Sequence, residues 1–246
     1  MKDALGDRMK EQYENRTRFM LPRRTYTIIR VDGKAFHTLL RGWFHTLLQG
    51  CAPFDPEVSE AMQHATKLLC HEAQGVCFGY TQSDEISVVL QDFASTQTCA
   101  WFDGNVQKIC SVAASCVTQA FNNKFPALVS GHAMFDARVF TIPDPTEVEN
   151  YFIWRQQDAV KNSVQMLART LFSHQELEGK SQPEMHQMLY TVGVNWAERD
   201  TWEKHGIGVY RIEDMGWYVD KSIPVFTQDR KWLQKKIPRY PRAIDV

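Results

Sequence analysis

Two acidic positions that are far apart in the chain could together hold divalent metal ions. Asp32 and Gly33 end a run rich in β-branched residues, whereas Asp84 and Glu85 stand between two apolar runs. Carboxylate oxygens suit Mg²⁺, which also takes the phosphate oxygens of a substrate, and the Gly33 carbonyl is a further candidate ligand. Two such ions about 3.5–4 Å apart can stabilise both oxygens of a phosphoryl transfer. These residues indicate metal-dependent phosphoryl-transfer chemistry if the fold brings them together.

The hydrophobic pattern predicts the elements that would do so. Strands and helices follow from period-two and helical spacing respectively, with strands over 24–31, 75–80, 85–90 and 133–142 and helices from about 34 and over 56–74, 98–122 and 148–172. The order βαββαβ, with one further helix, is that of an α+β ferredoxin-like fold with one antiparallel sheet. In this split order the first strand can neighbour the hairpin, so Asp32 would lie near Asp84.

Composition sets the expected organisation. The 246 residues, 43% of them hydrophobic, suffice for a palm-like catalytic domain over 1–172 with an N-terminal helix, and an extension over 173–246 that packs on it. No run is long enough to span a bilayer, and the polar start lacks a signal segment, so we expect a soluble, cytoplasmic protein without a membrane partner. The six cysteines show no CxxC spacing, which argues against a structural zinc site.

The C-terminal segment is the part of the chain whose charge suggests nucleic acid. The net charge is only −1, but the basic tail at 230–246 contains a stretch over 230–242 with no acidic residue. Trp232 and Tyr240 are interleaved with its lysines and arginines. Basic clusters with aromatic residues are typical of nucleic-acid binding. A solvated tail is the alternative, and composition does not separate the two.

Short motifs along the chain resemble, in the right order, those of the tRNA(His) guanylyltransferase superfamily, the 3′-to-5′ polymerases. The similar segments are 30–37 (RVDGKAFH), 80–87 (YTQSDEIS), 101–108, 135–139, 154–158, 179–181 and 224–230. The ordered set covers about residues 5–232. The resemblance implies a polymerase palm that extends the 5′ end of tRNA, with two Mg²⁺ ions and with ATP and GTP as substrates. It also implies a homotetramer.

The resemblance assigns roles to individual residues. Asp32, the Gly33 carbonyl and Asp84 would hold the metals, and Glu85 would support them. Nucleotide contacts would come from Arg30, Lys34, Phe36, His37, Asp55, Ser83, Asn105, Lys108, Lys161 and Asn162. RNA contacts would come from Lys180, Arg230, Lys231, Lys235 and Lys236. Strand alternation places Arg30 on the face of Asp32, and Lys108 follows Asn105 by three residues on one helix face.

Departures from the family pattern refine the expected activity. The guanylyltransferase branch carries His-Ile-Asn-Asn where this chain has residues 160–163, Val-Lys-Asn-Ser. The chain is therefore more similar to the branch that restores 5′-truncated tRNAs by templated addition. Residues 37–42 recur in part as 45–50, and Ala52 stands where relatives often have a basic residue, which affects the alignment of Asp55. The alternatives are untemplated guanylyl transfer to tRNA(His), a nucleotide cyclase-like palm enzyme, and a non-catalytic RNA-binding protein.

Overall fold

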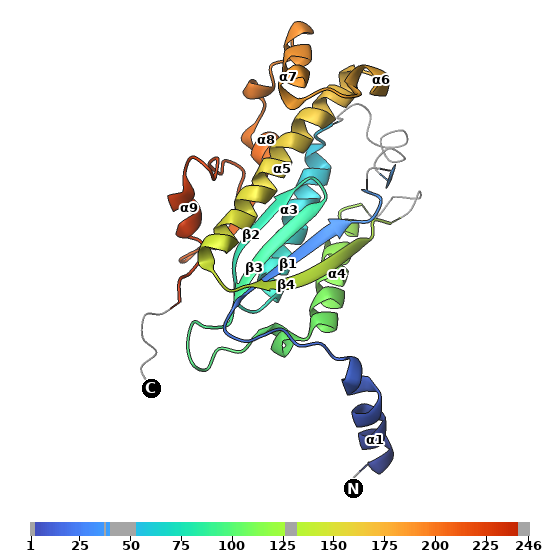
Figure 1. Ribbon diagram of the computed structural model, residues 1–246, viewed down its shortest axis with the longest axis vertical. Coiled ribbons are helices and arrows are strands. Elements are labelled where there is room, and N and C mark those ends of the chain that lie inside the picture. The colour runs from blue at the N-terminus through green and yellow to red at the C-terminus, as the bar shows by residue number, and fades with distance from the viewer. Residues whose placement is uncertain (1–2, 37, 40–52, 126–131, 241–246) are drawn as a thin grey trace.

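The fold is organised around one antiparallel sheet of six strands in the order β4-β1-β3-β2-β5-β6 (Figure 1). The computed structural model describes residues 3–36, 38–39, 53–125 and 132–240, so His37, Ala52 and most of the partly duplicated loop lie outside the described residues. The strands are β1 (Tyr26–Gly33), β2 (Val76–Gln82), β3 (Glu85–Gln91), β4 (Phe135–Ile142), β5 (Ile207–Ile212) and β6 (Gly216–Asp220).

The first four strands confirm the α+β ferredoxin-like fold. β1 lies between β3 and β4 and is antiparallel to both, and β3 forms the expected hairpin with β2. The last two strands were not predicted. β5 pairs with the free edge of β2, and β6 pairs with β5. The division of the chain at residue 172 stays a prediction, and segments on both sides of it contribute strands to the same sheet.

The N-terminal helix and those predicted over 56–74 and 148–172 are present, the one predicted over 98–122 begins later, the one predicted from about 34 lies largely outside the described residues, and the helices after 172 were not predicted. The helices are α1 (Ala4–Gln12), α3 (Pro56–Glu72), α4 (Val106–Asn122), α5 (Pro145–Leu171), α6 (His174–Leu177), α7 (Gln182–Thr191), α8 (Thr201–His205) and α9 (Arg230–Gln234), with 3-10 turns at Glu14–Thr17, Trp101–Gly104 and Trp196–Glu198. The prediction that a helix begins at 98 was wrong. Phe102 and Asp103 have positive φ angles of 49° and 53°, which an α-helix excludes. Asn105 then caps α4 by accepting a hydrogen bond from the Lys108 amide at 3.0 Å.

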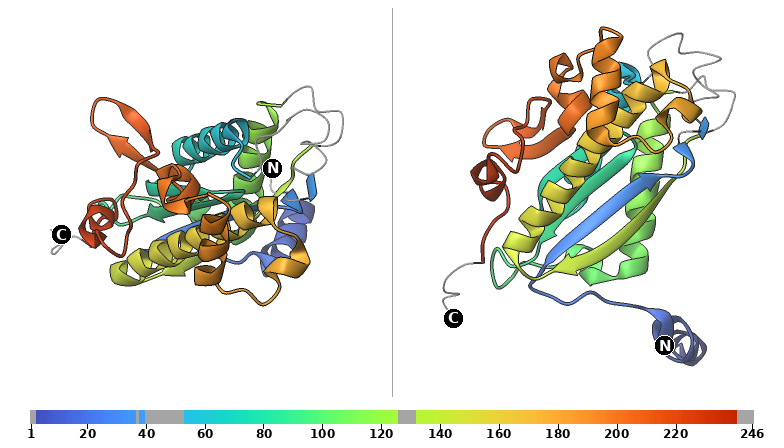
Figure 2. Two further views of the ribbon diagram at one scale, coloured as in Figure 1. Left: turned by 90° about the horizontal axis from the view of Figure 1, so that it is seen from above. Right: turned by 45° about the horizontal axis from the view of Figure 1, so that its top comes forward.

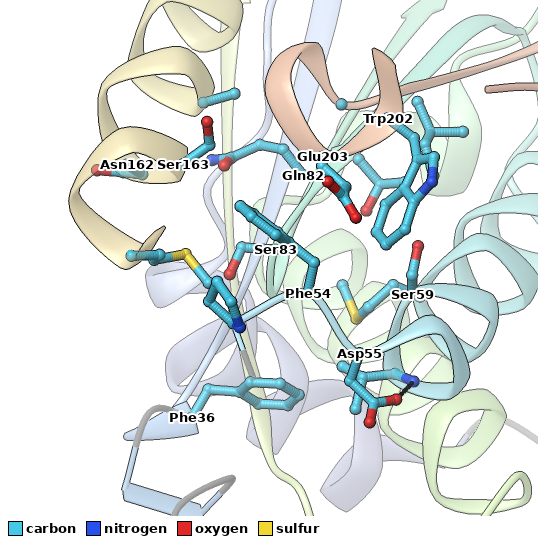
Figure 3. A pocket seen from close by; sticks show the side chains of 18 residues that line it. Phe36, Phe54, Asp55, Ser59, Gln82, Ser83, Asn162, Ser163, Trp202 and Glu203 are labelled. Atoms are coloured by element: carbon cyan, nitrogen blue, oxygen red, sulfur yellow. Dashed lines mark hydrogen bonds between the residues drawn. The ribbon is translucent and has the colours of Figure 1, made fainter. Parts of the chain in front are cut away.

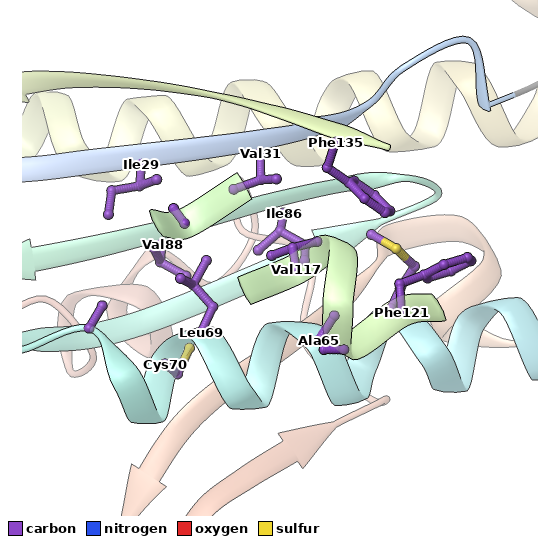
Figure 4. Packing of buried hydrophobic residues seen from close by; sticks show 14 of the residues in the cluster. Ile29, Val31, Ala65, Leu69, Cys70, Ile86, Val88, Val117, Phe121 and Phe135 are labelled. Carbon is purple, nitrogen blue, oxygen red and sulfur yellow. The ribbon is translucent and has the colours of Figure 1, made fainter. Parts of the chain in front are cut away.

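Helices cover both faces of the sheet because the strands alternate apolar residues on both sides. Ile29 and Val31 face α3 and α4, where Leu69 and Val117 join the same buried cluster (Figure 4). Tyr26 and the other even-numbered positions of β1 face α5, whose Phe152 belongs to the second cluster. Within the described residues, no helix is long and apolar enough to cross a membrane. α1 buries none of its residues and projects away from the sheet (Figures 1 and 2).

The C-terminal segment is fastened to α5 by a buried carboxylate. Glu149 is fully buried and pairs with Arg230, whose Nη1 lies 3.5 Å from its Oε2, and with Arg239. Gln234 donates a hydrogen bond to the same carboxylate at 3.2 Å. The Tyr26 hydroxyl donates to the carbonyl of Pro238 at 2.6 Å, which holds the segment at the start of β1. The segment that includes α9 is therefore part of the layer on the α5 face.

Candidate active site

Strand register gathers acidic side chains at one end of the sheet. Asp32 lies opposite Glu85 of β3 and opposite Asp136 of β4, so the three side chains point to the same face. Asp84 lies in the two-residue turn between β2 and β3, where the amide of Gly33 donates a hydrogen bond to the Asp84 carbonyl at 3.2 Å. The structure thus brings Asp32 and Asp84 together, as the split βαβ order predicts. Asp136 was not singled out from the sequence.

Gly33 leaves room for the Asp84 carboxylate. A Cβ on residue 33 would lie 2.8 Å from Asp84 Oδ2 and 2.7 Å from Phe36 Cδ2, far inside ordinary contact distances. Phe36 cannot withdraw easily, because its ring packs against Phe121 and Phe135 at centroid distances of 5.2 and 5.6 Å. Only a residue without a side chain permits this close approach.

The carboxylates at this end of the sheet differ in whether a cationic side chain lies next to them. Burial, and after it the neighbouring charge of Asp32, together raise the pKa of Asp84 to about 6. Burial also raises the pKa of Glu85, but Arg155 and Arg30 oppose that shift. Arg155 Nε lies 2.9 Å from Glu85 Oε1, and both side chains are almost fully buried. Across the described ranges, neither Asp32 nor Asp84 forms an ion pair with a cationic side chain.

This donor set fits a divalent cation. Asp32 and Asp84 supply two adjacent carboxylates without a cationic partner, and the Gly33 carbonyl is next to them. Mg²⁺ is commonly bound by one or two carboxylates, with water and substrate phosphates in the other positions. In the part of the chain that the structure describes, no group of three or more His, Cys, Asp or Glu side chains could hold a metal. A cation here would therefore depend on substrate and water oxygens for its remaining ligands.

A pocket of about 720 Å³ opens beside the hairpin tip (Figure 3). Of the residues predicted to contact nucleotides, Phe36, Asp55, Ser83 and Asn162 line it. They come from the end of β1, the start of α3, the β2–β3 turn and α5. Trp202 of α8 adds a large aromatic wall.

Two of these residues have structural roles as well. Asp55 caps α3, since its Oδ1 accepts hydrogen bonds from the amides of Glu57 and Val58 at 2.8 and 3.0 Å. Asn162 donates to Asp158 Oδ2 at 3.1 Å. Each side chain is thereby held in a defined orientation at the pocket wall.

A chain of polar contacts connects the pocket to the hairpin. Arg155 pairs with Glu85 through Nε, and its Nη2 donates to Asp158 Oδ2 at 2.5 Å. Asp158 in turn holds Asn162. Neither Arg155 nor Asp158 was singled out from the sequence, although both belong to the quoted segment 154–158. Their helical spacing of three residues was the available signal.

Other predicted nucleotide-binding residues lie outside the pocket. Arg30 lies on the face of Asp32, as alternation predicts, and its Nε is buried without a hydrogen-bond partner among the described residues. Lys34 and Lys161 are exposed. Asn105 and Lys108 lie at the start of α4, where Asn105 pairs with Met20, upstream of β1. The far end of α4, in contrast, bonds to Ala133 through Asn122, close to the carboxylates. One chain therefore does not bring Asn105 and Lys108 to the site.

The residues predicted to bind RNA divide into packed and exposed ones. Arg230 pairs with the buried Glu149, and Lys236 Nζ lies 3.3 Å from the centroid of the Tyr210 ring. Burial lowers the pKa of Lys236. Lys180 is exposed and lies 3.9 Å from Glu184. Lys231 and Lys235 are exposed on and just after α9.

Comparison with known proteins points in one direction. Residues 6–143 match the Thg1 family, described as tRNAHis guanylyltransferase. A bacterial tRNA(His) guanylyltransferase (Thg1)-like protein solved in complex with ATP is 38% identical, with 95% of this chain and 99% of that chain covered and a TM-score of 0.85. A bacterial Thg1-like protein in complex with GTP is 34% identical, with 96% and 99% covered and a TM-score of 0.78. The tRNA(His) guanylyltransferase of Schizosaccharomyces pombe is 27% identical over 233 residues, which are 87% of this chain and 84% of that protein.

Proposed function

Because this chain belongs to the tRNAHis guanylyltransferase family, which is a family of nucleotidyltransferases, we propose that it adds nucleotides to the 5′ end of truncated tRNA in the 3′-to-5′ direction. The observation that carries the proposal is the position of Asp84. It lies next to Asp32 and at the tip of the hairpin whose Ser83 lines the pocket. The similar bacterial proteins that were solved with ATP and with GTP support a nucleotide in this pocket.

The proposed reaction consists of two phosphoryl transfers. An oxygen of the 5′-monophosphate of the RNA attacks the α-phosphorus of ATP, a phosphoanhydride to AMP forms, and pyrophosphate leaves. The 3′-hydroxyl of an incoming NTP then attacks the 5′ phosphorus of the RNA, and AMP leaves. A 5′-triphosphate end needs no activation, and its pyrophosphate is then the leaving group. The base added would be selected by pairing with the opposite strand of the acceptor stem.

The side chains have separate tasks in this proposal. Phe36 and the other pocket walls seat the activating nucleotide, while Ser83 and Asn162 donate hydrogen bonds to its phosphates. Asp32, Asp84 and the Gly33 carbonyl hold Mg²⁺, which when bound acidifies the attacking hydroxyl and stabilises charge on the leaving phosphate. Arg30 lies on the face of Asp32 and contributes positive charge to the phosphates of the reacting 5′ end.

The residues that depart from the guanylyltransferase pattern support templated repair over untemplated addition. Of residues 160–163, Asn162 and Ser163 line the pocket, and Ser163 also accepts a hydrogen bond from Trp196 Nε1 at 2.7 Å. Lys161 is exposed and is not among the residues that line the pocket. Val160, which stands in place of the branch's histidine, is not among the residues that line the pocket, so at the pocket wall this chain differs from that pattern by the serine at 163.

Assembly belongs to the same proposal. Asn105 and Lys108 lie at the other end of the sheet from Asp32, so they can contact the substrate nucleotides only from a neighbouring subunit. A homotetramer, which the family resemblance implies, would supply such a neighbour. A cytoplasmic location follows from the proposed substrate.

The test is 5′ extension of a tRNA that lacks its first nucleotide, with Mg²⁺, ATP and the four NTPs. Wild-type protein should add the nucleotide that pairs with the opposite base, while Asp32→Ala and Asp84→Asn should add none and remain folded. Asp214→Asn is the matched control, because Asp214 also lies in a hairpin turn, exposed and between β5 and β6. Absence of growth from both monophosphate and triphosphate ends would refute the proposal. Formation of a cyclic nucleotide from NTP alone, or tRNA binding without turnover, would identify the corresponding alternative.

A further inference from the structure

α5 carries an exposed tryptophan whose ring packs against two neighbouring side chains of the same helix. Trp154 is 51% exposed. The guanidinium carbon of Arg155 lies 4.1 Å from the centroid of its ring, and the Tyr151 ring approaches it at 5.9 Å. Arg155 is itself held by Glu85 and Asp158. The indole is thus positioned by a rigid network, while half of its surface is available to a ligand.

Contacts on both sides of Trp154 along α5 determine where it lies over the sheet. Three residues earlier, the Tyr151 ring packs against Phe140 of β4 at 5.6 Å. At the next residue, Arg155 pairs with Glu85, which lies directly across from Asp32. One turn of helix advances about 5.4 Å, close to two residues of a strand. Trp154 therefore lies between the level of Phe140 and the level of Asp32.

Two arginines occupy that level on the neighbouring strands. Arg30 of β1 and Arg138 of β4 are register partners, two residues from Asp32 and two from Phe140, respectively. The Arg138 side chain is 51% exposed, and its ion pair with Asp136 is long, at 3.4 Å. The Arg30 Nε has no hydrogen-bond partner among the described residues. No helix lies in front of β1 and β4 in Figures 1 and 2, since α5 covers the β2 and β3 side of this face.

An exposed indole beside two guanidinium groups matches the chemistry of a nucleotide at the end of a strand. Aromatic rings stack on bases of any sequence, and arginine binds phosphate through two parallel hydrogen bonds. The pocket with Phe36 and Ser83 lies on the other side of the hairpin tip, among α3, α8 and the part of α5 that follows Arg155. The Trp154 side is open, as the end of a duplex would require. Two nucleotide-binding surfaces thus flank Asp32 and Asp84.

We propose that Trp154 stacks on the 5′-terminal base pair of the RNA acceptor stem, and that Arg30 and Arg138 contact its 5′ phosphate. The inference rests on the proposed function, because it assigns the RNA end to the open side of the same site. Stacking of one base on an aromatic side chain corresponds to an effect of about 5- to 100-fold on affinity. The phosphate contacts are electrostatic and should weaken as salt is added.

The experiment uses the full chain and a hairpin RNA that mimics an acceptor stem, with 2-aminopurine as its 5′-terminal base and no NTP present. Binding of wild-type protein should quench the 2-aminopurine fluorescence. Trp154→Ala should abolish the quenching and weaken RNA binding by about 5- to 100-fold, whereas Trp154→Phe should retain most of both. Tyr190→Ala removes another exposed aromatic residue, 68% exposed on α7, and should leave both unchanged. ATP binding without RNA should be the same in all four proteins.

The outcomes separate this inference from the proposed function. Quenching and affinity that are unchanged in Trp154→Ala, or equal quenching of a label placed in the middle of the stem, would overturn it. So would unchanged RNA affinity with a raised KM for the incoming NTP, because the surface would then take the NTP base. If wild-type protein shows Trp154-dependent quenching but never extends RNA, the proposed activity fails while the RNA-end surface stands.

Discussion

Replacement of Gly33 by alanine tests whether the Asp84 carboxylate must lie against a bare Cα. The added Cβ would meet Phe36 Cδ2 at 2.7 Å, Asp84 Oδ2 at 2.8 Å and Phe36 Cβ at 2.9 Å. Ordinary contacts of a Cβ begin near 3.4 Å, so the neighbours must separate by about 0.6 Å. Phe36 is only 3% exposed and is packed among other phenylalanine rings, whereas Asp84 lies in a turn. We expect Asp84 to move.

The magnitude follows from the use of that carboxylate. Overpacking of this kind costs about 1–3 kcal/mol in the free energy of unfolding. A displacement of about 1 Å in a catalytic group can reduce the rate about 100-fold. If the Asp84 carboxylate moves by about 0.6 Å, kcat for 5′ extension should fall by about 10- to 100-fold. The Mg²⁺ concentration needed for half-maximal activity should rise.

The assay pairs single-turnover extension, at several Mg²⁺ concentrations, with urea denaturation. Gly179→Ala is the control for a loss of stability alone. Its φ is 74°, which strains any L-residue, and no atom lies within 4 Å of the new Cβ. Both variants should lose a similar free energy of unfolding, but only Gly33→Ala should lose activity and Mg²⁺ affinity. Gly33→Ala with wild-type kinetics would refute the assignment of this glycine to the position of Asp84.

Three further perturbations follow from the charges. Since the pKa of Asp84 is about 6 and its ordinary value is 3.8, the protein without metal should gain stability as pH falls from about 6 to 4, where the folded state binds the proton more tightly. Asp84→Asn should raise Tm in EDTA at pH 8 and flatten that pH dependence; an unchanged Tm would contradict this. Arg155→Lys cannot reproduce the forked contact with the carboxylates of Glu85 and Asp158, so catalytic efficiency should fall by about 10-fold or more. Extension kinetics that match wild type would show that Arg155 does not position these two carboxylates for the reaction. Lys231→Ala and Lys235→Ala should each reduce the salt dependence of RNA binding by about one phosphate contact. Lys236→Ala should instead lower Tm and leave the salt dependence unchanged, because Lys236 packs on the Tyr210 ring. Fluorescence titrations of RNA at several salt concentrations check both expectations.

The part of the fold that the sequence predicts is the part that local pattern determines. Period-two alternation in β1 assigns Ile29 and Val31 to one face and Tyr26 to the other, and the structure has this arrangement. β5 and β6 are shorter, and they become strands because β5 pairs with the free edge of β2 and β6 pairs with β5. The start of α4 was misplaced because left-handed backbone at Phe102 and Asp103 interrupts a stretch whose composition favours helix.

The candidate site shows the same division. Asp32 and Asp84 could be placed together because a topological rule of the split βαβ fold makes their strands neighbours. The contact between Arg155 and Asp158 follows from helical spacing, but the contact of Arg155 with Glu85 depends on how α5 packs across the sheet, which no local pattern gives. The basic tail was read as an RNA-binding segment, but part of its charge neutralises Glu149, a residue far away in sequence.

The buried carboxylates differ in whether the chain supplies a cationic partner for them. Glu149 and Glu85 are both buried, and each has arginine partners within the chain. A buried carboxylate without such a partner is costly, which is why its pKa rises. Asp84 has a raised pKa and no cationic partner among the described residues. The charge that acts on it is that of another carboxylate, Asp32. An internal arginine would offset part of this cost, as Arg155 and Arg30 do for Glu85. Under the proposed function, the lack of such an arginine in the described surroundings leaves excess negative charge for a cation that would arrive with the substrate, and the metal-free fold is less stable at this point.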